Sequence, residues 1–149
     1  WQTALRAGVL AVLVAGVVAF VSGSGGEGSR RDRIHWQPLS EQAIVRALAE
    51  NKRVFVDVTA DWCVTCKANK YNVLLRDDVQ VALSAPDVVA LRGDWSRPSD
   101  TISQFLTTRG SAAVPFNQIY GPGLPQGHVL PALLSREAVL STLSDAKGK

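Results

Sequence analysis

The sequence has very little cysteine and histidine, and this limits the sites it can form. Its two cysteines, Cys63 and Cys66, are separated by two residues. If they act as a redox pair, no cysteine remains for a structural disulfide. The number of cysteines therefore does not indicate whether the protein works in an oxidising or a reducing compartment. Internal repeats are also absent. The sequence also lacks a stripe of basic residues with interleaved aromatic residues, and this absence argues against nucleic-acid binding.

An unbroken run of apolar residues and glycine covers residues 7–21, and Arg6 is the only charged residue within or before it. With its flanks the run reaches about 20 residues, the length of a membrane-spanning helix, and Trp1 would be an interfacial anchor. We therefore expect a transmembrane helix over residues 1–22. Because the chain begins with Trp rather than Met, we expect this helix to end a larger membrane domain. A cleaved signal peptide is the alternative.

Residues 23–33 are predicted to be a flexible linker, because the stretch SGSGGEGS at 22–29 has nothing to bury. The folded domain is predicted for residues 34–149. Apolar residues make up 46% of the whole chain, which is sufficient for a packed core.

Strands and helices alternate along this domain. Extended segments are predicted over 36–39, 53–59, 88–92, 116–120 and 128–130. Helices are predicted over 41–50, 67–75, 77–84, 100–109 and 136–145. Their expected N-caps include Ser40, Ser99 or Asp100, and Ser135. Residues 121–127 are predicted to be a turn. The alternation predicts an α/β fold with helices on both faces of a central sheet.

The cysteines stand where the strand over 53–59 runs into a helix. Thiolate is the attacking form of cysteine, and a helix N-terminus favours it. Cys63 is nearest to that end and is the predicted nucleophile. Cys66 lies one helical turn further and faces the same way, so it is placed to resolve a mixed disulfide.

Asp57 lies inside an otherwise apolar strand, and two interpretations stay open. Burial would raise its pKa and make it a proton partner for the resolving thiol. Alternatively, it is a strand-end carboxylate that faces solvent or makes a structural hydrogen bond. Asp61 either modulates the charge near the cysteines or is an ordinary surface acid. Trp62 either packs beside the pair or is a core residue.

A zinc site is the main alternative chemistry for the two cysteines. A structural zinc ion needs four ligands, and only His35 and His128 could complete the set. Because these histidines lack paired spacing, we expect no metal. The expected redox group is the Cys63–Cys66 disulfide, with no separate cofactor.

At this point residues 56–67, VDVTADWCVTCK, resemble the active-site strand and helix start of the thioredoxin superfamily. Their form is most similar to the C-terminal thioredoxin-like domain of the DsbD family of transmembrane thiol:disulfide interchange reductases. The resemblance runs from about residue 34 to the C-terminus. It implies a thioredoxin-like fold with a central mixed sheet flanked by helices.

The resemblance also implies roles for individual residues. It makes Cys63 the attacking cysteine, Cys66 the resolving cysteine and Asp57 the buried acid. It also places a cis-proline opposite the pair. The residues expected around the active site are Asp61, Trp62, Lys67, Val114 and Pro115.

The family further implies a function. Electrons would pass from a membrane-embedded cysteine domain to this domain, and then to a periplasmic thioredoxin-like or immunoglobulin-like domain and client disulfide proteins. The location would be the bacterial inner membrane, with this domain in the periplasm. The alternative is a stand-alone, membrane-anchored thioredoxin-like protein that reduces apocytochrome c or other client disulfides. Two features depart from the family pattern. Phe116-Asn117 follows the proline where many thioredoxins have Thr, which implies a different partner groove. Thr65 stands where many reducing thioredoxins have Pro, so the reducing direction rests on the resemblance alone.

Overall fold

The computed structural model describes residues 30–149, and a compact unit spans Arg31–Lys149. The transmembrane helix predicted over residues 1–22 and most of the linker predicted over 23–33 lie outside the described residues. Within residues 30–149, no helix is long and apolar enough to cross a membrane.

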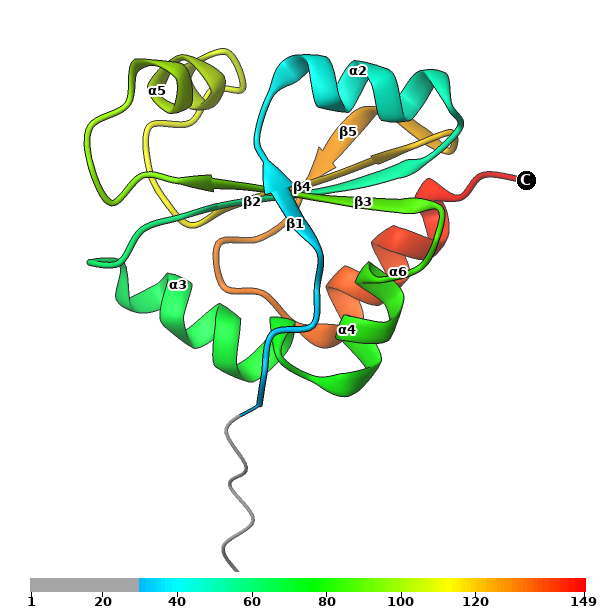
Figure 1. Ribbon diagram of the computed structural model, residues 1–149, viewed down its shortest axis with the longest axis horizontal. Helices are drawn as coiled ribbons and strands as arrows, with labels where there is room; N and C mark the ends of the chain where they lie inside the picture. The colour runs from blue at the N-terminus through cyan, green and yellow to red at the C-terminus, as the bar shows by residue number, and fades with distance from the viewer. Residues whose placement is uncertain (1–29) are drawn as a thin grey trace, which may run out of the picture. The chain divides into compact units, whose positions relative to one another are not determined.

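A five-stranded sheet forms the centre of this unit (Figure 1). The strand order is β1-β3-β2-β4-β5; β1 and β2 pair parallel with β3, whereas β2–β4 and β4–β5 are antiparallel. The sheet is therefore mixed, as the resemblance implies. The strands are β1 (Trp36–Pro38), β2 (Arg53–Thr59), β3 (Val88–Asp94), β4 (Phe116–Gly121) and β5 (Leu124–Val129).

Helices cover both faces of the sheet, as predicted (Figure 1). One face carries α2 (Glu41–Ala49) and α5 (Asp100–Thr107). The other carries α3 (Val64–Asn69), α4 (Asp77–Leu83) and α6 (Arg136–Ala146). Strand β2 is central and buried on both faces, which explains its continuous apolar run.

The alternation of side chains along β2 divides the core into two layers. Val54, Val56 and Val58 pack in the cluster with residues of α2 and α5. Phe55 packs in the cluster with residues of α4 and α6. Because successive strand residues point to opposite faces, Asp57 lies on the Phe55 side, the face that also carries α3.

Serine side chains cap three of the predicted helices. The hydroxyl oxygen of Ser40 accepts from the backbone N of Ala43 at 3.0 Å, and that of Ser135 accepts from Ala138 at 3.1 Å. Ser99 rather than Asp100 caps α5, accepting from Ile102 at 3.3 Å. The predicted N-caps are thus confirmed.

The helix predicted over 67–75 is confirmed as far as residue 74, but it begins earlier than predicted and changes type along its length. It starts as α3 at Val64 and continues as the π-helix η1 (Lys70–Leu74), in which Leu75 N donates to Lys70 O at 2.9 Å. The change follows buried Asn69, whose side chain bonds Ala132 O at 2.8 Å and Leu134 N at 3.0 Å. The π-helix therefore begins directly after the residue whose side chain binds the loop at 132–134.

The turn predicted over 121–127 is also wrong, since β5 already begins at Leu124, which pairs with Gly121. Pro125 is tolerated because β5 is an edge strand. Gly127 has a φ of +77°, and a Cβ there would lie 2.5 Å from the Tyr120 ring. Proline and glycine therefore mark an edge strand with a shifted register here, not a long loop.

Candidate active site

Cys63 and Cys66 form a disulfide at the junction between β2 and α3. Their Cα atoms are 5.2 Å apart, and each residue is 6% exposed. Cys63 is the N-cap of α3, and its sulfur accepts a hydrogen bond from the backbone N of Cys66 at 3.1 Å. In the reduced protein, such a donor would favour a thiolate on Cys63 over one on Cys66.

Asp57 lies at the centre of a row of polar side chains that crosses three strands. It is the direct cross-strand neighbour of Arg92 on β3 and of Asn117 on β4. Its Oδ2 accepts a hydrogen bond from Nε of Arg92 at 2.9 Å, and Nη2 of the same guanidinium forms an ion pair with it at 2.9 Å. Its Oδ1 accepts from Nδ2 of Asn117, also at 2.9 Å. Both carboxylate oxygens therefore have donors.

Burial nevertheless dominates the proton affinity of this carboxyl group. Asp57 is 5% exposed, and burial raises its pKa above the ordinary range. The positive charge of Arg92 and the hydrogen bond from Asn117 act in the opposite direction. A carboxyl group with a raised pKa is a stronger base and can hold a proton nearer neutral pH. Because Asp57 is buried, the solvent-facing interpretation is wrong, whereas its bonds with Arg92 and Asn117 confirm a structural hydrogen bond. Its role as a proton partner stays a prediction.

Asp57 and Cys66 line one polar cavity of about 350 Å³. Asp61 and Lys67 also line this cavity, and both are exposed. The buried acid and the second cysteine therefore face one shared cavity.

Two site residues, Arg92 and Asn117, were missed by sequence reasoning. Asn117 is 2% exposed; its Nδ2 also bonds Val56 O at 3.3 Å, whereas its Oδ1 has no partner among the described residues. Arg92 follows the apolar residues at the start of β3, and Asn117 stands beside Gln118 in β4. Neither is therefore the single polar residue of an apolar strand, as Asp57 nearly is in β2. Matching these polar positions across the strands would have required the register of the sheet.

An apolar groove lies on another side of the disulfide. It has a volume of about 460 Å³, and its walls include Trp62, Trp95 and Val114. Trp62 is 62% exposed, so it is not a core residue. Val114 packs against Cys63 and Cys66, and the Val114–Pro115 peptide bond is cis.

The two histidines do not join the cysteines. His35 precedes β1 and His128 lies in β5, and these strands are the opposite edges of the sheet. Among residues 30–149, no cluster of three or more His, Cys, Asp or Glu could hold a metal ion.

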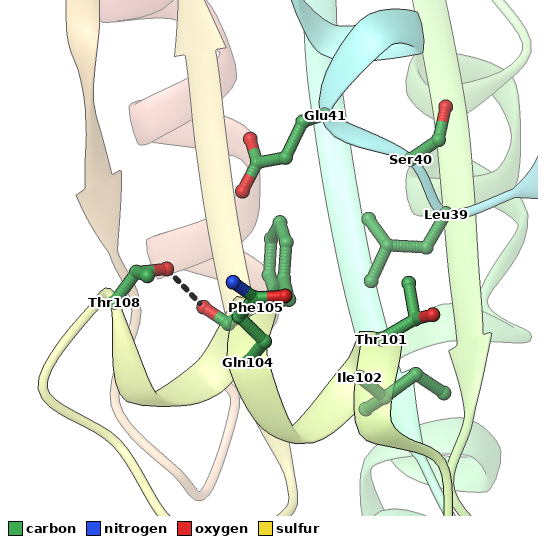
Figure 2. Close-up of a pocket in the computed structure, with 8 residues that line it drawn as sticks. All are labelled: Leu39, Ser40, Glu41, Thr101, Ile102, Gln104, Phe105 and Thr108. Carbon is green, nitrogen blue, oxygen red and sulfur yellow. Dashed lines mark hydrogen bonds between the residues drawn. The ribbon is translucent and has the colours of Figure 1, made fainter.

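A further cavity, of about 260 Å³, lies between the start of α2 and α5 (Figure 2). Phe105 and Ile102 supply apolar walls, and Glu41 is the acid at its rim. The dashed line in Figure 2 is the hydrogen bond from the Thr108 hydroxyl to Phe105 O, at 2.9 Å. No cysteine lines this cavity, so the candidate site is the disulfide with Asp57.

Comparison with known proteins identifies the family of the fold. The family described as thioredoxin-like matches residues 35–122. No curated protein matches the chain.

Among solved structures, the oxidised DsbD C-terminal domain of Neisseria meningitidis is 19% identical. The match covers 71% of this chain and 91% of that one, with a TM-score of 0.57. A thioredoxin from Thermus thermophilus is 22% identical, with 74% and 85% covered and a TM-score of 0.55. At these identities the two structures support the fold.

Proposed function

The chain belongs to the thioredoxin-like family, and from that premise we propose that its described domain is a protein-disulfide reductase. The observation that carries the proposal is the Cys63–Cys66 disulfide with buried Asp57 on the same cavity as the second cysteine. A nucleophile, a resolving thiol and a proton partner are the groups that thiol–disulfide exchange needs.

Reduction of a client proceeds in two exchanges. The Cys63 thiolate attacks one sulfur of the client disulfide, the client S–S bond breaks, and its other sulfur leaves as a thiolate. Cys66 then gives its proton to the Asp57 carboxylate and attacks the Cys63 sulfur. The Cys63–Cys66 disulfide forms and the second client thiolate leaves. The client gains two electrons and the cysteine pair loses two.

Re-reduction runs the same steps backwards with a donor dithiol. The donor thiolate attacks Cys63, and Cys66 leaves as a thiolate that takes the proton held by Asp57. A second donor thiolate then frees Cys63, and the donor ends as a disulfide. A raised pKa at Asp57 serves both directions, because the group must accept the proton and later return it.

The groove beside the disulfide supplies a place for the client chain. Trp62, which precedes Cys63 in the chain, and Trp95 offer flat apolar surface in this groove. We propose that an extended segment of the client lies against these side chains while its disulfide meets Cys63. The exposure of Trp62 supports this placement, since a large apolar side chain open to solvent often marks a contact surface.

We further propose that this domain is the terminal relay of a DsbD-type protein of the bacterial inner membrane. The electron donor would be a membrane-embedded cysteine domain, and the acceptors would be periplasmic domains and client proteins. The apolar run over residues 7–21 and the similarity to the Neisseria meningitidis domain support this part of the proposal.

Trapping in cells tests the proposal. A Cys66→Ser variant of the full chain cannot resolve the first exchange, so it should accumulate mixed disulfides with clients through Cys63. The matched control is Cys63→Ser, which should trap none. Absence of adducts with Cys66→Ser would overturn the assignment of the nucleophile.

The reduction potential of the pair tests the direction. It is measured by equilibrating the full chain with glutathione buffers and counting free thiols. A reductase should have a potential well below that of strong periplasmic oxidants, so a value near about −120 mV would overturn the reducing direction.

A further inference from the structure

The arginine that pairs with Asp57 also contacts a second carboxylate, at the start of the domain. Nη1 of Arg92 lies 3.4 Å from Oδ2 of Asp32, while Nε and Nη2 hold Asp57 at 2.9 Å. The Arg92 side chain is 24% exposed and that of Asp32 is 25% exposed. One cation therefore lies between two acids, in a site only partly open to water.

Asp32 is fixed in this position by its own segment. Its Oδ1 accepts from the backbone N of Ile34 at 3.1 Å, and its Oδ2 accepts from Nε1 of Trp36 at 2.9 Å. The Trp36 ring also lies under the Arg92 guanidinium, 3.7 Å from the ring centroid. Asp32, Trp36 and Arg92 thus form one packed group beside the sheet.

The neighbouring residue fastens the same segment by separate contacts. Arg33 donates its backbone N to Gln80 at 2.6 Å, and its guanidinium pairs with Asp77 at 2.7 Å. This pair is exposed, and neither Arg33 nor Asp77 is among the groups that hold Asp57. The chain therefore offers a matched control for any change at Asp32.

We propose that Asp32 is a positioning residue for the proton step at Asp57: by sharing Arg92, it weakens the hold of that arginine on the Asp57 carboxylate. The inference rests on the proposed function for its kinetic consequence, but its electrostatic part stands on the contacts alone. It connects the start of the domain, where the preceding segment joins, to the acid beside Cys66.

The groups around Asp57 show in which direction Asp32 changes the pKa of that carboxyl. Burial is the largest influence and raises the pKa of Asp57, Arg92 lowers it, and the negative charge of Asp32 adds to the rise. On the other strand, β4, the neighbour is the uncharged Asn117. The remaining titratable groups that face the shared cavity are Asp61, Cys66, Lys67, Lys70, Tyr71 and Asp94. Substitution of Asp32 leaves the identity of all these residues unchanged.

Neutralising Asp32 should therefore strengthen the pairing between Arg92 and Asp57. Asp32→Asn removes the charge and keeps one side-chain oxygen, which can accept from either Ile34 or Trp36 but not from both. The Asp57 carboxylate then ionises at lower pH and becomes a weaker base. In catalysis, proton transfer from Cys66 should begin at lower pH, yet its rate at high pH should fall by about threefold.

The direct test is a pH titration of the Asp57 carboxyl carbon by NMR in the oxidised full chain. Asp32→Asn should move the transition to lower pH, and Arg92→Gln should move it to higher pH. Arg33→Gln loosens the same segment without changing these charges, so it should leave the transition in place. If Asp32→Asn does not move the transition, or Arg33→Gln moves it equally, the proposal is wrong.

The kinetic test measures resolution of the mixed disulfide against pH. An earlier onset with a lower plateau is the expected signature of Asp32→Asn, whereas mere loosening of the fold would lower the rate at every pH. If the unmodified chain reduces no disulfide, the proposed function fails, and the NMR titration still decides whether Asp32 acts on Asp57.

Discussion

Two arginines make the same kind of contact on opposite faces of the sheet, and their surroundings give them different roles. Arg109 stacks on Phe105, 3.6 Å from the ring centroid, and binds both oxygens of Glu41 at 2.6 and 2.9 Å. Arg92 stacks on Trp36 and binds Asp57. Each arginine is thus held by one aromatic ring and at least one carboxylate.

The difference lies in where the carboxylate is placed. Glu41 stands in the first turn of α2 at the rim of a cavity, and its side chain is 57% exposed (Figure 2). Asp57 stands within a central strand, and its side chain is 7% exposed. Water solvates the first carboxylate, whereas the second depends on its two protein donors. The same pairing of arginine with a carboxylate is therefore solvated at the surface in one place and buried within the sheet in the other.

Substitution of the buried acid should have the largest effect. Asp57→Asn cannot accept the Cys66 proton, so resolution of a mixed disulfide near neutral pH should slow by about 100-fold. The step is measured by rapid mixing of the reduced protein with a disulfide peptide. Glu41→Gln is the matched control on the other face and should resolve the mixed disulfide at the normal rate. If it slowed resolution equally, the buried and the exposed carboxylate would not differ in their effect on the exchange.

The second effect concerns stability against pH. Below the ordinary carboxyl pKa, the folded and unfolded chains both hold the Asp57 proton. Because burial raises the folded pKa, the unfolded chain ionises first as pH rises, and the free energy of unfolding falls until the folded carboxyl ionises too. Urea unfolding of the oxidised protein at a series of pH values should show this decline. Asp57→Asn should remove it and Glu41→Gln should retain it.

Loss of Arg109 should lower the stability of the fold without changing the rate of disulfide exchange. The Nε of Arg109 donates to Gln118 Oε1 and to Tyr120 Oη, each at 3.0 Å. Arg109→Ala removes these bonds and the stacking on Phe105, so the free energy of unfolding should fall by about 2 kcal/mol. Urea denaturation measures the loss, and the rate of disulfide exchange should not change. A large loss of rate would mean that this face also serves the site.

The exposed acid should have the smallest effect. Glu41→Gln should cost about 0.5 kcal/mol of unfolding free energy, because an exposed ion pair gains little over its solvated partners. Most of this difference should disappear in about 1 M salt, which screens surface charges. Urea denaturation at low and high salt gives both values. A loss that persisted in high salt would show a contribution beyond charge.

Local patterns explain how much of this fold could be predicted. The β-branched run of β2 and the serine caps of α2, α5 and α6 are signals carried by neighbouring residues, and these elements were found. The same holds for the Cys63–Cys66 pair, whose spacing is visible in the sequence. The start of β5 was missed because proline and glycine are ordinary turn residues, and only pairing with β4 turns them into an edge strand.

The missing part of the site depends on distant pairing. Arg92 lies 35 residues after Asp57, and Asn117 lies 60 residues after it. In the sequence, each is one of two polar residues in its strand. The parallel register with β3 and the antiparallel register with β4 place them on either side of the acid. Asp32 is more remote still, since it contacts Asp57 only through Arg92.

The two outer strands of the sheet share one further property. β1 is three residues long and ends at Pro38, and β5 contains Pro125. Proline has no N–H to offer a neighbouring strand, and short edges give a poor template for adding one. Under the proposed function the domain would bind extended polypeptides transiently, and such binding would expose its sheet to unwanted strand addition and fibril growth. Proline at both edges guards against that hazard, while the sulfur chemistry takes place at the end of β2.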